Sequence, residues 1–240
     1  MPSSNPTLRP AAFENVERSV GPAMSLSGTI NRSAILLLLV ILGASYTWNT
    51  TSQYAPILTF GGGIAGFIIA MVTIFKMKWA PFTSPVYALC EGLFLGGISA
   101  MYNTQSQGIV LQAVMLTFGV LATMLFLYQM RIIRVNDTFR TVITAAIGGI
   151  ALVYVVGFVL GFFGIQMPFI NDASPIGIGI SLFIVGIASL SLALDFDTIE
   201  KGIQARAPRY MEWYCAFGLM ISLIWLYLEI LRLLSKLNRR

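Results

Sequence analysis

The chain has 240 residues and a formal net charge of +5; 57% of its residues are hydrophobic, only 10% are charged, and none is histidine. Its mean hydropathy is +0.80. A soluble domain needs charged side chains to cover its surface, so this composition predicts a chain embedded in a lipid bilayer. The lack of histidine excludes Ser-His-Asp hydrolysis and histidine-ligated zinc. With so few basic residues, nucleic acid is not an expected partner.

Residues 1–32 are polar and rich in Pro, Ser and Asn, and they lack the apolar core and cleavage site of a signal peptide. They predict a polar N-terminal arm, with a short interfacial helix near Ala12–Val20. Residues 33–240 are expected to form a single transmembrane domain.

Seven apolar segments follow the arm, each close to the roughly 20 residues that a helix needs to cross the hydrocarbon core. The segments are continuously apolar and do not alternate as barrel strands do, and backbone groups in lipid must bond within their own segment. The predicted fold class is therefore all-α, a polytopic membrane protein with seven transmembrane helices. The expected spans are Ser33–Trp48, Pro56–Phe75, Pro85–Tyr102, Gly108–Gln129, Arg140–Gly164, Pro175–Phe196 and Trp213–Leu234.

Basic residues predict the orientation of these spans. They occur in the arm and in the second, fourth and sixth connectors, whereas the first, third and fifth connectors have none. Positive residues favour the cytoplasmic side, so the N-terminus is expected on the cytoplasmic side of a bacterial inner membrane. Seven spans then place the C-terminal tail outside, although it carries Arg232, Lys236, Arg239 and Arg240. A re-entrant last helix with a cytoplasmic tail is the alternative.

Glycines recur within the expected helices, and in lipid such small residues allow helix backbones to approach closely. Tight helix packing is the favoured interpretation, and a functional hinge is the alternative. The positions are Gly61, Gly62, Gly63, Gly66, Gly92, Gly96, Gly157, Gly161, Gly177 and Gly179.

Ionisable residues within spans are the best functional signal in this chain, because each costs about 2.5–3.5 kcal/mol at the centre of a helix. Glu91 lies in the third span, roughly 9 Å from its cytoplasmic end, and is expected to face other helices. Asp195 and Asp197 lie at the inner end of the sixth span, at a similar depth. Being two residues apart on a helix, they point about 200° apart, so one aspartate is expected to face inward.

The three acids predict a proton or cation site, because carboxylates in a low dielectric resist simultaneous ionisation and calcium prefers their oxygens. Asp197 and Glu91 are the expected transient calcium ligands. An interfacial ion pair between Asp197 and Lys201 is the alternative interpretation of Asp197. Glu229 and Arg232 in the last span are expected to form a structural ion pair.

Four segments resemble the Bax inhibitor-1 / YccA-like membrane family, in particular its bacterial branch with a long polar arm. They are SLSGTINRSAILLLL, SPVYALCEGLFLGGIS, SLALDFDTIEKG and LMISLIWLYLEILRLLSKL. The resemblance covers nearly the whole chain from Met24 onward, and LDFDTIEKG is its most specific part.

This resemblance implies that the last helix lies at the centre of the bundle and that the protein is a pH-sensitive calcium leak. In the family, aspartates on the sixth and seventh helices share a proton. The first matches Asp197, but Ser222 occupies the position of the second, so a two-aspartate latch is in doubt here. Glu91 is our candidate for the missing acid, and Lys76 or Lys78 for a basic partner.

Two functions follow from these patterns. The leading hypothesis is a calcium leak gated by protonation of Asp197 and Glu91. The second is a non-conducting regulatory protein whose arm binds a membrane protease or another complex; the resemblance supports this because one bacterial relative modulates a membrane-bound ATP-dependent protease. The chain has no Gly-rich phosphate loop, GxSxG or HExxH motif, so neither an enzyme nor a cofactor is expected.

Overall fold

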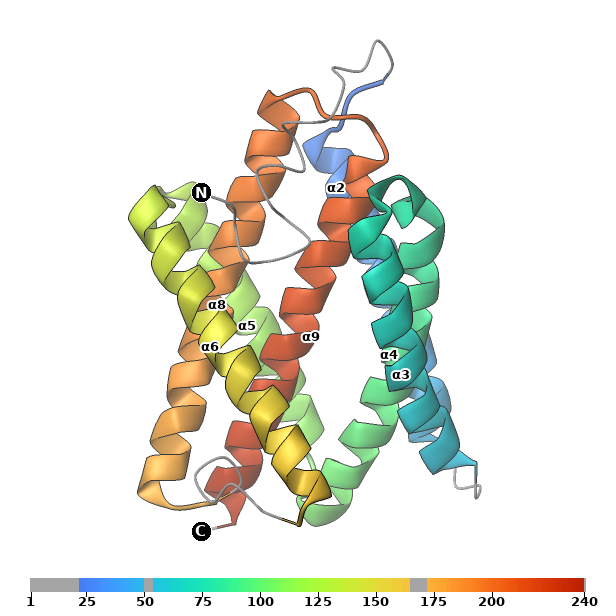
Figure 1. Cartoon of the computed structure of the whole chain (residues 1–240), viewed down its shortest axis with the longest axis vertical. Helices are drawn as coiled ribbons and strands as arrows, with labels where there is room; N and C mark the ends of the chain where they lie inside the picture. The colour runs from blue at the N-terminus through green and yellow to red at the C-terminus, as the bar shows by residue number, and fades with distance from the viewer. Residues whose placement is uncertain (1–21, 50–53, 165–171, 240) are drawn as a thin grey trace. The chain divides into compact units, whose positions relative to one another are not determined.

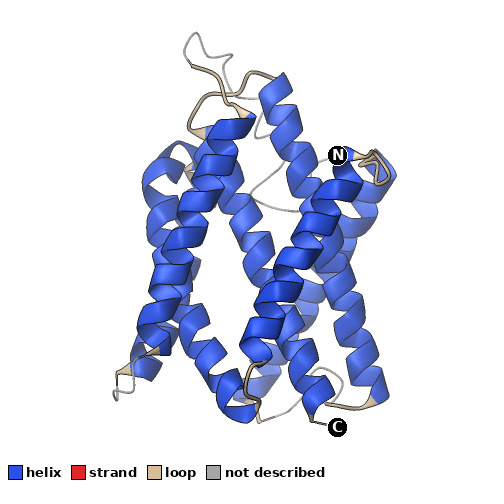
Figure 2. Ribbon diagram, turned by 180° about the vertical axis from the view of Figure 1, so that it is seen from behind, coloured by secondary structure: helices blue, strands red, loops and turns tan. Residues whose placement is uncertain are grey.

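The computed structural model describes residues 22–49, 54–164 and 172–239. Every regular element in this part of the chain is a helix, apart from one antiparallel β-bridge between Ala23 and Pro208 (Figure 2). The predicted interfacial helix near Ala12–Val20 lies outside the described residues.

Seven of these helices are long and apolar enough to cross a membrane, as predicted (Figure 1). They are α2 (Leu26–Trp48), α3 (Ala55–Phe75), α4 (Ala80–Gln105), α5 (Ile109–Gln129), α6 (Asp137–Phe162), α8 (Pro175–Gln204) and α9 (Met211–Asn238). A 3-10 turn, η1 (Met77–Trp79), leads into α4.

Several helices extend beyond their predicted ends, most of all α2, α4 and α8. α2 begins at Leu26 rather than Ser33, because the Ser25 side chain caps it by accepting a hydrogen bond from the Gly28 N–H. α4 begins at Ala80, so Pro85 lies inside the helix rather than at its start. α8 continues to Gln204 and therefore includes the polar sequence that follows Phe196.

The chain divides into two compact units, and the division cuts through α8 and α9. Unit 1 holds residues 106–196 and 222–240, and unit 2 holds residues 6–105 and 197–221.

In unit 2, α4 packs against both α2 and α3, and glycines form these contacts. A Cβ atom at Gly92 would collide with the backbone of Val40 on α2, and one at Gly43 would lie 2.7 Å from the Leu89 carbonyl. Gly62 on α3 faces the Cys90 carbonyl of α4 in the same way. The prediction of close packing is therefore confirmed at Gly62, Gly63, Gly66, Gly92 and Gly96.

In unit 1, residues of α6, the first part of α8 and the second half of α9 pack together in a core centred on Ile143, Ile187 and Leu194. The packing prediction is wrong for Gly161 and Gly179 in this unit, and for Gly61 in unit 2, because a Cβ atom there would meet nothing within 4 Å. These glycines lie on exposed helix faces.

Burial differs strongly among the spans. Only 6% of the α6 span is buried, whereas half of the α9 span is. Exposed apolar side chains of α6, such as Phe158 and Val155, are suited to lipid. α9 is the most buried of the seven spans in the described part of the chain. α9 is also continuous over 28 residues, so it contains no turn of the kind that a re-entrant segment requires.

Candidate functional site

The two predicted aspartates of α8 are both buried. Asp195 is 1% exposed and belongs to unit 1, whereas Asp197 is 9% exposed and begins the second segment of unit 2. Asp197 Oδ2 lies 2.8 Å from Lys201 Nζ, one helical turn further along α8. The alternative interpretation of Asp197 as an ion-pair partner of Lys201 thus describes a contact that the structure contains.

Glu91 on α4 faces α3, in agreement with the expectation that it faces another helix. Its carboxyl group lies against Gly66, where an added Cβ atom would be 3.0 Å from Glu91 Oε1. Gly92, the next residue, faces α2 instead. Glu91 is therefore in contact with α3 and is half-buried.

The predicted basic partners lie at the exposed junction of α3 and α4. Lys76 Nζ lies 5.5 Å from the centre of the Trp79 ring, and both Lys76 and Lys78 are exposed. The cation recorded next to Asp197 is Lys201. Ser222, at the position of the family's second aspartate, is buried on the unit 1 half of α9.

No metal cage is present in the described residues, since no three Asp, Glu or Cys side chains there come together to hold an ion. Asp197 and Glu91 are thus not two ligands of such a cage.

Unit 1 contains the predicted ion pair of α9. Arg232 Nη1 donates to both carboxylate oxygens of Glu229 at 2.9 Å, and the Tyr154 hydroxyl of α6 donates to Glu229 Oε1 at 2.7 Å. Glu229 is only 1% exposed. Its carboxylate is therefore fully engaged, as a structural ion pair within a membrane helix requires.

Lys236, one turn beyond Arg232, is buried rather than part of a basic tail. Its Nζ donates to the Gly177 carbonyl at 3.0 Å and to Ser181 Oγ at 2.8 Å, both on α8. Lys236 and Arg232 are thus bound within unit 1. Two of the four charges that conflicted with a seven-span orientation therefore have internal partners.

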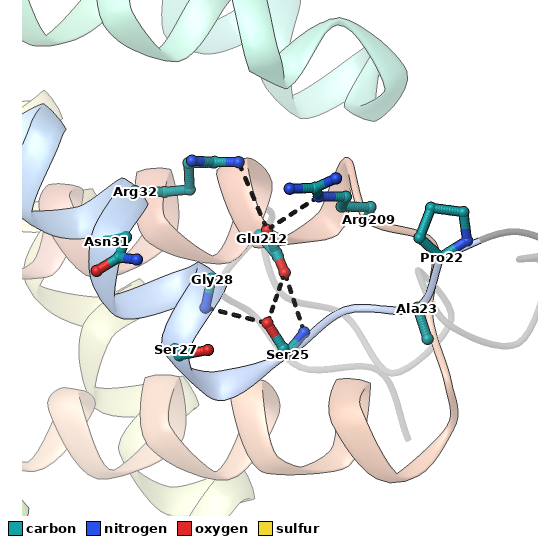
Figure 3. Close-up of a pocket in the computed structure, with 9 residues that line it drawn as sticks. All are labelled: Pro22, Ala23, Ser25, Ser27, Gly28, Asn31, Arg32, Arg209 and Glu212. Carbon is teal, nitrogen blue, oxygen red and sulfur yellow. Dashed lines mark hydrogen bonds and ion pairs between the residues drawn. The ribbon is translucent and has the colours of Figure 1, made fainter.

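The most elaborate polar site was not predicted, and it is centred on Glu212 in unit 2 (Figure 3). Glu212 lies in the first turn of α9 and is 2% exposed. Its Oε1 accepts hydrogen bonds from the Ser25 N–H at 3.1 Å and from the Ser25 hydroxyl at 2.9 Å. Gly28 leaves room for this carboxylate, because a Cβ atom there would collide with it.

Two arginines flank Glu212 at a greater distance. Arg32 Nη2 lies 3.9 Å and Arg209 Nε 4.0 Å from Glu212 Oε2, too far for hydrogen bonds. The Arg32 guanidinium stacks on Trp213, with 4.9 Å between Cζ and the ring centre. These groups surround a cavity of about 320 Å³. We call Ser25, Arg32, Arg209 and Glu212 the Glu212 cluster.

The Glu212 cluster also ties the start of α2 to the connector between α8 and α9. The Met24 N–H donates to the Ala207 carbonyl at 2.7 Å, and Ala23 forms the β-bridge with Pro208. Met24, Ala207 and Met211 are buried together beneath this contact. The sequence does give a signal for the cluster, since an acid in the first turn of a helix complements its dipole.

No curated protein and no solved structure matches the chain. A family model described as Bax inhibitor 1 like matches residues 5–239, which is nearly the whole chain. The match covers both units, the acids of α8 and the Glu212 cluster. The protein therefore belongs to the Bax inhibitor 1 like family.

Proposed function

We propose that this protein is a pH-sensitive calcium leak of a bacterial inner membrane, with its N-terminus in the cytoplasm, and that protonation of Asp197 operates its gate. The supporting observation is the contact between Asp197 and Lys201, in which a carboxylate with 13% side-chain exposure meets an ammonium group with 53% exposure. A buried acid paired with an accessible base is suited to respond to protons. The family resemblance supports the same activity.

Protonation of Asp197 weakens its pairing with Lys201. The ionised carboxylate attracts Lys201 at 2.8 Å, and adding a proton removes that attraction. Acidification therefore frees Lys201 and leaves a neutral carboxyl group at the end of α8. Because Ser222 replaces the second aspartate of the family, the gate in this chain uses a lysine as the partner of Asp197 instead of a second carboxylate. Glu91, enclosed between α3 and α4, is the second acid that we assign to the pathway.

Calcium flux into liposomes that contain the purified protein tests this function. We expect the wild-type calcium flux to change with pH, and the assay covers roughly pH 6 to pH 8. Asp197→Asn should remove this pH dependence, and Lys201→Gln should shift it. Glu200→Gln is the matched control, because this exposed neighbour loses the same charge but pairs with Gln204.

The opposite results would contradict the proposal. If wild type and Asp197→Asn leak calcium identically at every pH, Asp197 is not the gate. If the wild type passes no calcium at any pH, the protein is not a leak, and the regulatory alternative gains support. Deletion of residues 1–21, followed by capture of a membrane protease, then tests that alternative.

A further inference from the structure

The cavity of the Glu212 cluster has an unusual balance of charge. It is lined by one carboxylate, that of Glu212, and by two guanidinium groups, those of Arg32 and Arg209. Ser27 and Asn31 add polar side chains from the first turns of α2 (Figure 3). A purely anionic ligand would meet the carboxylate, and a purely cationic ligand would meet the two arginines.

Glu212 and Arg32 each have a polar atom that can still form a hydrogen bond with a ligand. Among the described residues, no donor bonds to the buried Glu212 Oε2, although Oε1 of the same carboxylate accepts two hydrogen bonds from Ser25. The buried Arg32 Nε likewise has no hydrogen-bond acceptor in this described part of the chain. A buried polar atom left in this state costs about 1–3 kcal/mol, so a ligand that supplies both a donor and an acceptor is favoured.

The arginines are suited to hold a phosphate. A guanidinium group offers planar paired donors that match phosphate oxygens. Stacking on Trp213 fixes the direction of the Arg32 group, and Arg209 has a side-chain exposure of 63%, which leaves it accessible. An ammonium group attached to the same ligand would donate to Glu212 Oε2.

The position of the cavity favours a lipid as the source of this ligand. It lies where the apolar spans α2 and α9 begin, and Trp213 of α9 is the type of residue that occupies membrane interfaces. Leu26 and Ile30, each beside a cavity residue on α2, are both 57% exposed. Their exposed side chains offer an apolar surface for acyl chains next to the polar cavity.

From these observations we propose that the Glu212 cluster binds a ligand carrying both a phosphate and a primary ammonium, the chemistry of a phosphatidylethanolamine headgroup. Arg32 and Arg209 hold the phosphate, and Glu212 Oε2 accepts a hydrogen bond from the ammonium. A choline headgroup lacks an N–H donor, and a glycerol headgroup lacks the positive charge. This site is independent of whether the protein conducts calcium.

Native mass spectrometry of the purified full-length chain in detergent tests the site. The lipid probes are dioleoyl phosphatidylethanolamine, phosphatidylcholine and phosphatidylglycerol, and the soluble probe is glycerophosphoethanolamine. We expect the first bound phosphatidylethanolamine to have a Kd about tenfold lower than that of the other two lipids, as one charge-assisted hydrogen bond provides. Glu212→Gln should abolish this preference, and Arg209→Gln should weaken binding of all three lipids.

Arg206→Gln is the control for charge, because Arg206 is exposed in the same connector and does not line the cavity. Arg209→Gln changes an exposed side chain, so the test does not depend on the folding of the Glu212 variant. Equal affinity for the three lipids, or equal effects of Arg206→Gln and Arg209→Gln, would overturn the proposal. Binding of the soluble probe as tightly as the lipid would support the chemistry and identify a soluble ester as the source.

Discussion

The two units use buried polar groups on the same helix in different ways. In unit 1, Glu229 is closed off by Arg232 at 2.9 Å and by the Tyr154 hydroxyl at 2.7 Å. In unit 2, Glu212 is equally buried, but its arginines remain 3.9 and 4.0 Å away, and one of its oxygens accepts no hydrogen bond from any residue that the structure describes. A satisfied carboxylate stabilises its surroundings, whereas one with an unused acceptor is available to a ligand. Burial alone therefore does not distinguish a structural acid from a binding site in this protein.

The units also differ in how their helices approach one another. Unit 2 brings α4 against α2 and α3 through glycines that face neighbouring backbone. In unit 1, glycines such as Gly119 on α5 and Gly149 on α6 have open space where a side chain would be. Because the backbones of α2, α3 and α4 are in close contact, the stability of this part of unit 2 is expected to fall when a larger side chain replaces one of these glycines. The helices of unit 1 are expected to tolerate added side chains at these positions.

The largest expected effect on stability comes from breaking the ion pair between Glu229 and Arg232 in unit 1. Glu229→Ala should lower the free energy of unfolding by about 3 kcal/mol, because it leaves Arg232 without its charge partner in a membrane helix. This value is at the lower end of the range for buried pairs, since the Arg232 side chain is 31% exposed. Thermal unfolding in detergent measures the effect. The double variant with Arg232→Met should recover part of the loss, and equal loss in single and double variants would contradict the assignment.

Glycine substitutions test the second difference between the units. Gly92→Ala should destabilise the protein by about 2–3 kcal/mol, because its new methyl group collides with the Val40 backbone, which cannot rotate away. Gly119→Ala is the matched control in unit 1 and should be neutral or stabilise by up to about 1 kcal/mol. The unfolding temperatures of the two variants, each compared with the wild type, measure this difference. Similar losses in both would mean that glycine spacing does not distinguish the units.

Much of the fold follows from composition. Seven continuous apolar runs predict seven helices, because no other structure satisfies the backbone of such runs in lipid. The ends of the helices were harder to predict, since polar residues at a membrane surface continue a helix as readily as they end it. The residues preceding Ser33 were assigned to the arm, yet the Ser25 cap starts α2 at Leu26. Caps depend on side-chain geometry that polarity alone does not reveal.

The difficulty of placing helix ends also explains why the Glu212 cluster is not predicted. The sequence pattern starts the last span at Trp213, so Glu212, the residue before it, does not count as an acid within a span. Its partner Ser25 lies 187 residues earlier in the chain, so no local spacing connects the two. In contrast, Glu229 and Arg232 are three residues apart on one helix, and that spacing alone predicted their contact. Local pairs were predictable, whereas long-range contacts required the fold.

The smallest expected effect compares two helix caps, one in each unit. Ser25 caps α2 and also donates to Glu212, whereas Asn136 caps α6 by accepting a hydrogen bond from the Phe139 N–H at 2.7 Å. Asn136→Ala should cost about 1 kcal/mol, the usual loss for such a cap. Ser25→Ala should cost about 1 kcal/mol more, because the Glu212 carboxylate also loses the hydroxyl donor. Paired unfolding measurements give the difference directly. Equal costs would show that the bond from Ser25 to Glu212 adds no stability, and the link between α2 and α9 would then have to rest on the Met24 and Ala207 backbone contact.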